Sequence, residues 1–366
     1  MYKTILQGRF SHKFRSLTIS ILITLTVMTR RLLGKPMVRE WSSLFEIANL
    51  FWRAQFNHAL SLTSPQTSRA YFDSLYTVLD HQLDIDVRAT QPDEPRGDWF
   101  IPRQTKSEVT MLYLHGGGYA FYAAVTRKMI EMLAQHLGIA IFAPDYRLTP
   151  EHPHPAQLDD GLAAYQYLLA RGIKPNRLVI AGDSAGGHLM LMLLVRLREL
   201  KLNQPVIGIG ISPWTDVGLR PPNDSQFGND RFDMVQGYMT LKFAQWLKGD
   251  STFTDAELSP IHQKVNGLAP IYLQAGGKEI LVDMIRDFAQ CATEQQARVR
   301  LDVWEHMTHE FHAYGNHLAE SQQALSCMRD AITWATNANA QSVFATCAQT
   351  EINNLQAHNS IHTECT

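Results

Sequence analysis

At the centre of the chain stands Leu178-Val179-Ile180-Ala181-Gly182-Asp183-Ser184-Ala185-Gly186-Gly187, an apolar run that leads into a G-x-S-x-G pattern and then a helical sequence. This context predicts a tight strand-to-helix turn that lifts the Ser184 hydroxyl over the edge of a sheet. The residues beside the serine are small because larger side chains would collide in such a turn. The free N–H groups at the start of the following helix favour developing negative charge. Ser184 is therefore the predicted nucleophile.

A glycine-rich loop, His115-Gly116-Gly117-Gly118, directly follows another apolar run at 111–114. Glycines allow backbone N–H groups to turn toward a substrate oxygen with no Cβ in the way. The amides of Gly116, Gly117 and Ala185 are predicted to form an oxyanion hole. A phosphate-binding loop is the alternative, but the Lys-Ser/Thr ending of a P-loop and the glycine spacing of a dinucleotide site are absent.

A serine nucleophile needs a base, and the base needs a carboxylate that orients it. In hydrolases with this turn the chain order is serine, acid, histidine. His309 follows the last predicted strand and is the predicted base. Glu279 lies closest to the end of the strand at 271–275 and is the preferred acid, while Asp283, one helical turn further on, stays open as the alternative. The histidines around His309 lack the H-E-x-x-H spacing, so no metal is expected.

Short β-rich runs alternate with longer helical stretches after about residue 98. The runs lie at 109–114, 139–143, 177–181, 206–212, 271–275 and 299–304, and the helical stretches at 127–137, 158–171, 187–200 and 279–296. This alternation predicts a mostly parallel sheet covered by helices on both faces. The predicted catalytic domain covers 98–336, with a cap insertion at 214–260. Cap helices and a lead-in are expected over 36–97, and a disordered tail over 337–366.

The N-terminal segment, residues 1–35, differs from the rest of the chain in charge. Residues 1–39 carry eight Lys or Arg and no Asp or Glu. Four of these cations precede an apolar stretch at 16–29, and four follow it. As a helix this stretch spans roughly 21 Å, which is short of the ~30 Å hydrocarbon core of a bilayer. Three interpretations stay open: contact with a membrane surface through 16–29, an extra helix packed on the protein, and a cleaved signal peptide. The third is disfavoured because no A-x-A-like site follows, so the expected location is cytoplasmic or membrane-associated.

The overall composition excludes some classes of partner. The formal net charge of −2 gives no electrostatic reason to expect binding to nucleic acid. The four cysteines have no CxxC or CxxH spacing, which argues against a zinc site and predicts isolated thiols.

Four motifs occur together in one order: His115–Gly118, Asp145–Pro153, Gly182–Gly187 and Ser212–Asp216. In this order the chain resembles the hormone-sensitive-lipase (GDXG) family of α/β-hydrolases over roughly residues 98–335. The resemblance implies an eight-stranded α/β-hydrolase core with a helical cap. It also implies hydrolysis of small carboxylic esters, here expected to carry short to medium acyl chains, without metal or organic cofactor. Homodimers are common among similar proteins.

The resemblance also bears on the acid and on the alternatives to ester hydrolysis. In the family the acid precedes the histidine by about thirty residues, most often as Asp followed by Pro-Leu, and this count reaches Glu279. Because the chain departs from that pattern, Asp283 stays open. Hydrolysis of amides or N-acyl groups uses the same residues and is one alternative. A ligand-binding protein without catalysis is another, although plant receptors of that kind lack the triad histidine, which is present here as His309.

Overall fold

The computed structural model describes residues 3–6, 8–78, 83–105, 108–336 and 350–355. Within these ranges a nine-stranded sheet runs in the order β11-β10-β9-β8-β7-β5-β6-β4-β3. Its strands are β3 Ile85–Ala89, β4 Gly97–Pro102, β5 Thr110–Leu114, β6 Ala140–Pro144, β7 Leu178–Asp183, β8 Ile207–Ile211, β9 Ile271–Gly276, β10 Val299–Trp304 and β11 Thr350–Asn353. Strands β5 to β10 pair in parallel, while β3, β4 and β11 pair antiparallel.

Helices cover both faces of this sheet. They are α4 Ala124–Leu137, α5 Ala156–Ala170, α6 Ala185–Glu199, α10 Val282–Glu294 and α11 Ala319–Thr336. Successive residues of a strand point to opposite faces, so Met111 packs with Ile130 of α4 on one face. Leu112 packs in the core on the other face, which contains Leu189 of α6 and Ile285 of α10. The parallel strands are buried on both sides, which explains their nearly continuous apolar sequences.

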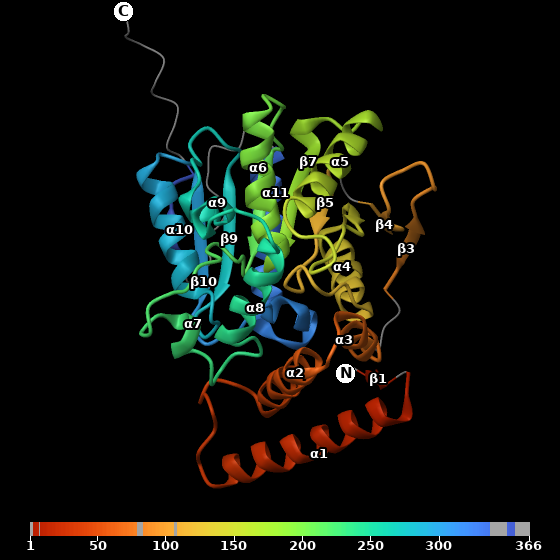
Figure 1. Cartoon of the computed structure of the whole chain (residues 1–366), viewed down its shortest axis with the longest axis vertical. Helices are drawn as coiled ribbons and strands as arrows, with labels where there is room; N and C mark the ends of the chain where they lie inside the picture. Colours follow the sequence, from red (N-terminus) through yellow and green to blue (C-terminus); the bar gives the residue numbers. More distant parts are fainter. Residues whose placement is uncertain (1–2, 7, 79–82, 106–107, 337–349, 356–366) are drawn as a thin grey trace, which may run out of the picture.

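The remaining elements gather at the carboxyl ends of the parallel strands (Figure 1). They are α2 Ser43–Ser61, α3 Pro65–Phe72, α7 Ser225–Gly228, α8 Gly237–Lys248 and α9 Asp255–Leu258, with short 3-10 turns η2 Pro260–His262 and η3 Phe311–His317. A further 3-10 turn, η1 Pro175–Arg177, directly precedes β7 and lies at the amino end of that strand. The Ser42 and Ser64 side chains accept hydrogen bonds from the first turns of α2 and α3, so local capping determines where both helices begin.

The N-terminal segment forms a long helix, α1 Phe10–Leu32, which packs along α2 at the outside of the molecule (Figure 1). A short strand before it, β1 Lys3–Leu6, pairs antiparallel with β2 Leu75–Val78. Among the helices that the structure describes, none combines the length and the apolar character needed to cross a bilayer.

The structure corrects three expectations from the sequence. The sheet has a ninth strand beyond the expected eight, because residues 350–353 pair with β10. Disorder therefore does not hold for this part of 337–366; residues 337–349 and 356–366 lie outside the described residues. Cys327 is disulfide-bonded, whereas Cys291 is free, so isolated thiols were the wrong expectation for Cys327. Spacing along the chain does not report which thiols meet in the fold.

Candidate active site

Ser184 occupies the turn between β7 and α6. Its backbone adopts φ 52° and ψ −118°, a conformation that side-chain-bearing residues rarely take. A Cβ on Gly186 would collide with the carbonyl of Leu114, so glycine is required for the turn to close. Ser184 is partly exposed while the residues on either side of it are buried. The turn therefore presents one hydroxyl to the space above the strand ends.

The glycine loop after β5 differs in part from the prediction. The N–H of Gly116, predicted to form part of an oxyanion hole, donates to Asp183 Oδ1 at 2.9 Å in the structure. Gly117 and Gly118 adopt positive φ of 99° and 61° and line the cavity beside Ser184. Neither of their N–H groups donates a hydrogen bond within the described residues. The sequence alone does not indicate which two of three consecutive glycines have free amides, so it does not predict a role for Gly118.

His309 and Glu279 meet although 30 positions of sequence separate them. The Nδ1 atom of His309 lies 4.0 Å from Glu279 Oε1, and both side chains are almost completely buried. The other oxygen of Glu279 accepts hydrogen bonds from Ser212 Oγ at 2.7 Å and from the N–H of Gly276 at 2.8 Å. These bonds keep one carboxylate oxygen in place and leave the other for the imidazole.

Asp283, the alternative acid, lies in the first turn of α10 and has other partners. Its Oδ2 accepts from the N–H of Ser225 at 2.9 Å, and its Oδ1 lies 3.3 Å from Arg286 Nη1. The structure thus brings Glu279, and not Asp283, to His309.

Asp233, in the stretch between β8 and β9, is a buried carboxylate that the sequence did not reveal. Its Oδ1 accepts from the N–H of His309 at 3.1 Å, and its Oδ2 accepts from the N–H of Ile280 at 2.8 Å. Burial raises the pKa of Asp233 to about 7, with smaller effects from His309 and Glu279. Besides the N–H of the adjacent Met234, its partners are backbone groups distant in sequence, so no motif could have indicated it.

Glu310 is the second carboxylate that sequence reasoning missed. Its Oε1 lies 3.3 Å from Nε2 of His309, and its backbone is left-handed at φ 51°. Burial by itself would raise the pKa of Glu310, but the charge and hydrogen bond of His309 outweigh it, so the pKa is lowered. Burial would likewise lower the pKa of His309, yet Glu310 and Glu279 raise it well above its ordinary value. The imidazole therefore lies between two carboxylates.

Asp183 completes this polar group. Tyr113 Oη donates to its Oδ1 at 2.6 Å, as does the Gly116 amide. Burial and the nearby charge of Glu310 raise the pKa of Asp183 well above its ordinary value. Asp183 therefore carries a proton more readily than an exposed aspartate, next to a carboxylate that stays ionised beside His309.

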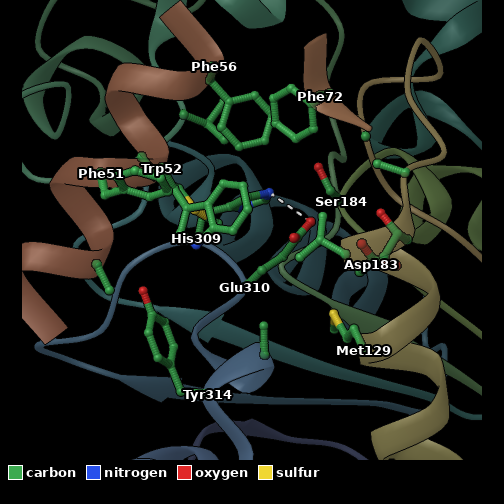
Figure 2. A pocket seen from close by; sticks show the side chains of 18 of the residues that line it. Phe51, Trp52, Phe56, Phe72, Met129, Asp183, Ser184, His309, Glu310 and Tyr314 are labelled. Atoms are coloured by element: carbon green, nitrogen blue, oxygen red, sulfur yellow. Dashed lines mark ion pairs between the residues drawn. The ribbon is translucent and has the colours of Figure 1, made fainter. Parts of the chain in front are cut away.

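One cavity of about 500 Å³ is lined by part of this polar group and by the glycine loop: Gly117, Gly118, Asp183, Ser184, His309 and Glu310. Figure 2 shows Phe56 and Phe72 above the Ser184 hydroxyl and the His309 ring, with Glu310 between His309 and Asp183. Six aromatic side chains form much of its wall: Phe51, Trp52, Phe56, Phe72, Phe121 and Phe243. A hydroxyl, an imidazole and free amides thus meet in a mostly apolar space, which is the arrangement that acyl transfer needs. Within the described ranges, no group of three or more His, Cys, Asp or Glu side chains is placed to hold a metal ion.

A family model described as alpha/beta hydrolase fold matches residues 111–313. The chain belongs to this family, which confirms the predicted fold class. The resemblance to the hormone-sensitive-lipase group is confirmed by a solved structure described as an esterase from the bacterial hormone-sensitive lipase (HSL) family. That structure is 28% identical, covers 78% of this chain and 97% of its own, and superimposes with a TM-score of 0.70.

Two curated bacterial proteins give the chain named relatives. An acetyl-hydrolase of Streptomyces hygroscopicus is 32% identical over 62% of this chain and 76% of its own length. An esterase of Acinetobacter venetianus is 29% identical over 72% of this chain and 87% of its own length.

Proposed function

We propose that this protein hydrolyses carboxylic esters through an acyl-enzyme formed on Ser184. One observation carries the proposal: Ser184, His309 and the glycine loop all line one apolar cavity, and the buried carboxylate of Glu279 lies behind the His309 imidazole. Similarity to proteins named esterase and acetyl-hydrolase supports the same chemistry. A small-molecule ester is accordingly the substrate.

In the proposed mechanism, Ser184 Oγ attacks the ester carbonyl while Nε2 of His309 takes the serine proton. The negative charge that develops on the carbonyl oxygen is stabilised by the amides of Gly117, Gly118 and Ala185. Ala185 begins α6, and the first N–H groups of a helix have no partner within it.

The second half of the reaction releases both products. The imidazolium of His309, oriented by Glu279, gives its proton to the leaving alcohol oxygen. Water then attacks the acyl group, its proton passes to His309, and return of that proton to Ser184 frees the carboxylic acid. No further reactant is required.

Short to medium acyl chains are the proposed substrates because the cavity is bounded by bulky aromatic side chains near Ser184. Phe121 and Phe243 line it beside the glycine loop, where a Cβ on Gly118 would collide with the ring of Phe243. The acetyl-hydrolase name of one relative supports a small acyl group.

Hydrolysis of p-nitrophenyl esters, from acetate to palmitate, tests the function. We expect Ser184→Ala to lose on the order of 10⁶ in kcat, because the nucleophile is removed while the amides and the cavity remain. Circular dichroism and thermal unfolding of the variant confirm that it folds. Undiminished turnover by Ser184→Ala would contradict the assignment. Activity only on amides would make the protein a deacylase, and rates that rise toward palmitate would contradict the short-chain substrate range.

A further inference from the structure

Helix α1 presents its apolar side chains to solvent. They recur every three or four residues and are between 45% and 86% exposed: Phe10, Phe14, Leu17, Ile21, Leu25, Met28 and Leu32. We call these residues the outer stripe. A surface helix of a globular protein normally turns such a stripe toward the core. Here the stripe extends along the helix for roughly 33 Å at 1.5 Å per residue, and no described element covers it.

The opposite side of α1 holds the helix in this orientation by polar contacts. Arg15 donates to Tyr71 Oη at 2.9 Å and to Gln55 Oε1 at 3.1 Å. Near the other end, Arg31 donates to the fully buried carboxylate of Glu46 at 2.6 Å. Rotating the outer stripe inward would separate these charged and polar partners. The exposure of the stripe is therefore a feature of the packed helix.

Charge determines which kind of partner fits the outer stripe. Residues 1–39 have eight Lys or Arg and no Asp or Glu. Four of these cations flank the stripe and form no ion pair within the described part of the chain: Arg9, Lys13, Lys35 and Arg39. Apolar side chains between cationic ends suit a helix that lies flat in the surface of an anionic bilayer. A second copy of the chain would bring like charges together at the ends of α1.

The cavity of the active site reaches the same helix. Ser16, Leu17 and Ser20 of α1 line the cavity that contains Ser184, and Leu17 is also a member of the outer stripe. We propose that α1 docks the protein on an anionic lipid surface, so that the cavity opens beside the bilayer and receives its ester from the lipid. The docking is inferred from the exposed apolar side chains and the cations of α1. Delivery of the ester also rests on the proposed function.

The first test measures binding to vesicles without turnover, in the Ser184→Ala background. Vesicles of phosphatidylcholine with phosphatidylglycerol are sedimented with the full chain. We expect binding that weakens in high salt and in pure phosphatidylcholine. Ile21→Glu with Leu25→Glu should lower the partition coefficient by roughly tenfold or more, because apolar contacts are lost and two negative charges are added. Neither residue lines the cavity.

The matched control adds the same two charges far from α1. Ala163→Glu with Gln166→Glu places them on exposed positions of α5, at the opposite end of the molecule (Figure 1). This control should bind as the parent does. Equal binding by the α1 variant, or no binding by the parent, would overturn the proposal. A dimer that the α1 variant dissociates, together with no vesicle binding, would instead assign the outer stripe to a second copy.

A second measurement, with Ser184 intact, tests delivery of the ester. The α1 variant should hydrolyse dissolved p-nitrophenyl butyrate within about twofold of the parent, because Ile21 and Leu25 lie outside the cavity. Its rate on an ester with short to medium acyl chains that is carried in anionic vesicles should fall by roughly tenfold or more. Equal rates on the embedded ester would overturn delivery. If the parent failed on every ester, the proposed function would fail, while sedimentation would still decide the docking.

Discussion

Glu310 places a carboxylate 3.3 Å from Nε2 of His309, the nitrogen that accepts the serine proton in the proposed mechanism. Together with Glu279 it raises the pKa of His309 well above its ordinary value, against the opposing effect of burial. A general base works in its neutral form, so a raised pKa moves the acid limb of the pH–rate profile to higher pH. Glu310 therefore restrains the base at neutral pH.

Glu310→Gln tests this restraint. Loss of the negative charge should lower the pKa of His309, move the acid limb of kcat/KM down by about one pH unit or more, and increase the rate at pH 6. The measurement is a pH–rate profile on a dissolved p-nitrophenyl ester. Glu294→Gln, an exposed position on α10, serves as the control. An acid limb that stays in place would show that Glu310 does not set the pKa of the base.

Glu279 and Asp283 make a second prediction, since only Glu279 faces His309. Glu279→Gln should reduce kcat by roughly a hundredfold or more, because the amide cannot stabilise the imidazolium. Asp283→Asn should stay within about threefold, since its partners are Ser225 and Arg286. Steady-state kinetics of both variants decide the matter. The reverse order of loss would transfer the acid role to Asp283.

The sequence could predict Ser184 and His309, but it could not predict the carboxylates around them. Ser184 is indicated by a turn whose geometry requires small neighbours, and His309 by its place after the last predicted strand. Glu310 follows the histidine directly, yet only a left-handed backbone at φ 51° turns it toward the imidazole. Such a conformation leaves no pattern in a sequence when the residue is not glycine.

At the scale of elements, Asp233 ties three loops together. It lies between β8 and β9 and accepts hydrogen bonds from Ile280, in the loop after β9, and from His309, in the loop after β10. The loops that carry the proposed acid and base are therefore fixed to each other by one buried carboxyl group. A residue of this kind acts on catalysis by positioning His309.

Asp233→Ala should destabilise the fold by about 1–3 kcal/mol at pH 5, because three buried N–H groups lose their acceptor. The pKa of Asp233 is about 7 in the fold and near 4 when unfolded, so the folded protein binds an extra proton between these values. Its contribution is thus complete below pH 4 and is lost as the pH rises through 7. The stability difference between parent and variant should narrow from pH 5 to pH 8.

Urea unfolding at both pH values measures this difference. Asp250→Ala, an exposed position in the same insertion, should change stability by less than about 0.5 kcal/mol. A difference that widens toward pH 8 would contradict the raised pKa of Asp233. The variant should also lose kcat more than it raises KM, since His309 is left less firmly placed.

The sequence predicts the fully buried strands of the sheet better than its partly exposed edge strands. The six predicted runs coincide with β5 to β10, which are parallel and carry apolar residues on both faces. β3 and β11 lie at the two edges of the sheet and have no fully buried residue. β3 has two partly buried residues followed by three exposed ones, and β11 alternates between partly buried and exposed residues over only four positions. Such short and partly exposed strands do not stand out from loops in a sequence, and the polar composition of 337–366 predicts disorder where β11 forms.

At the scale of the whole molecule, α1 is attached mainly through α2. Glu46 of α2 is the centre of this attachment, because its Oε2 accepts from Arg31 and its Oε1 from the N–H of Met37. The sheet with its covering helices has its own large core. Helix α1 is consequently expected to open without unfolding of the sheet, as weakly attached elements do.

Glu46→Ala tests whether α1 opens by itself. Leaving Arg31 and the Met37 amide without their acceptor should cost about 1–3 kcal/mol, which speeds amide exchange in α1 by roughly tenfold or more. Amide exchange in β5 to β10 should stay as slow as in the parent. The rate at which heating inactivates hydrolysis of a dissolved ester should also match that of the parent. Hydrogen exchange followed by mass spectrometry resolves the two regions, with Glu108→Ala, an exposed position, as control. Faster exchange in α1 and in the sheet together would show that the N-terminal helix and the catalytic core unfold as one unit. Contacts of α1 would then contribute to the free energy of unfolding of the whole domain.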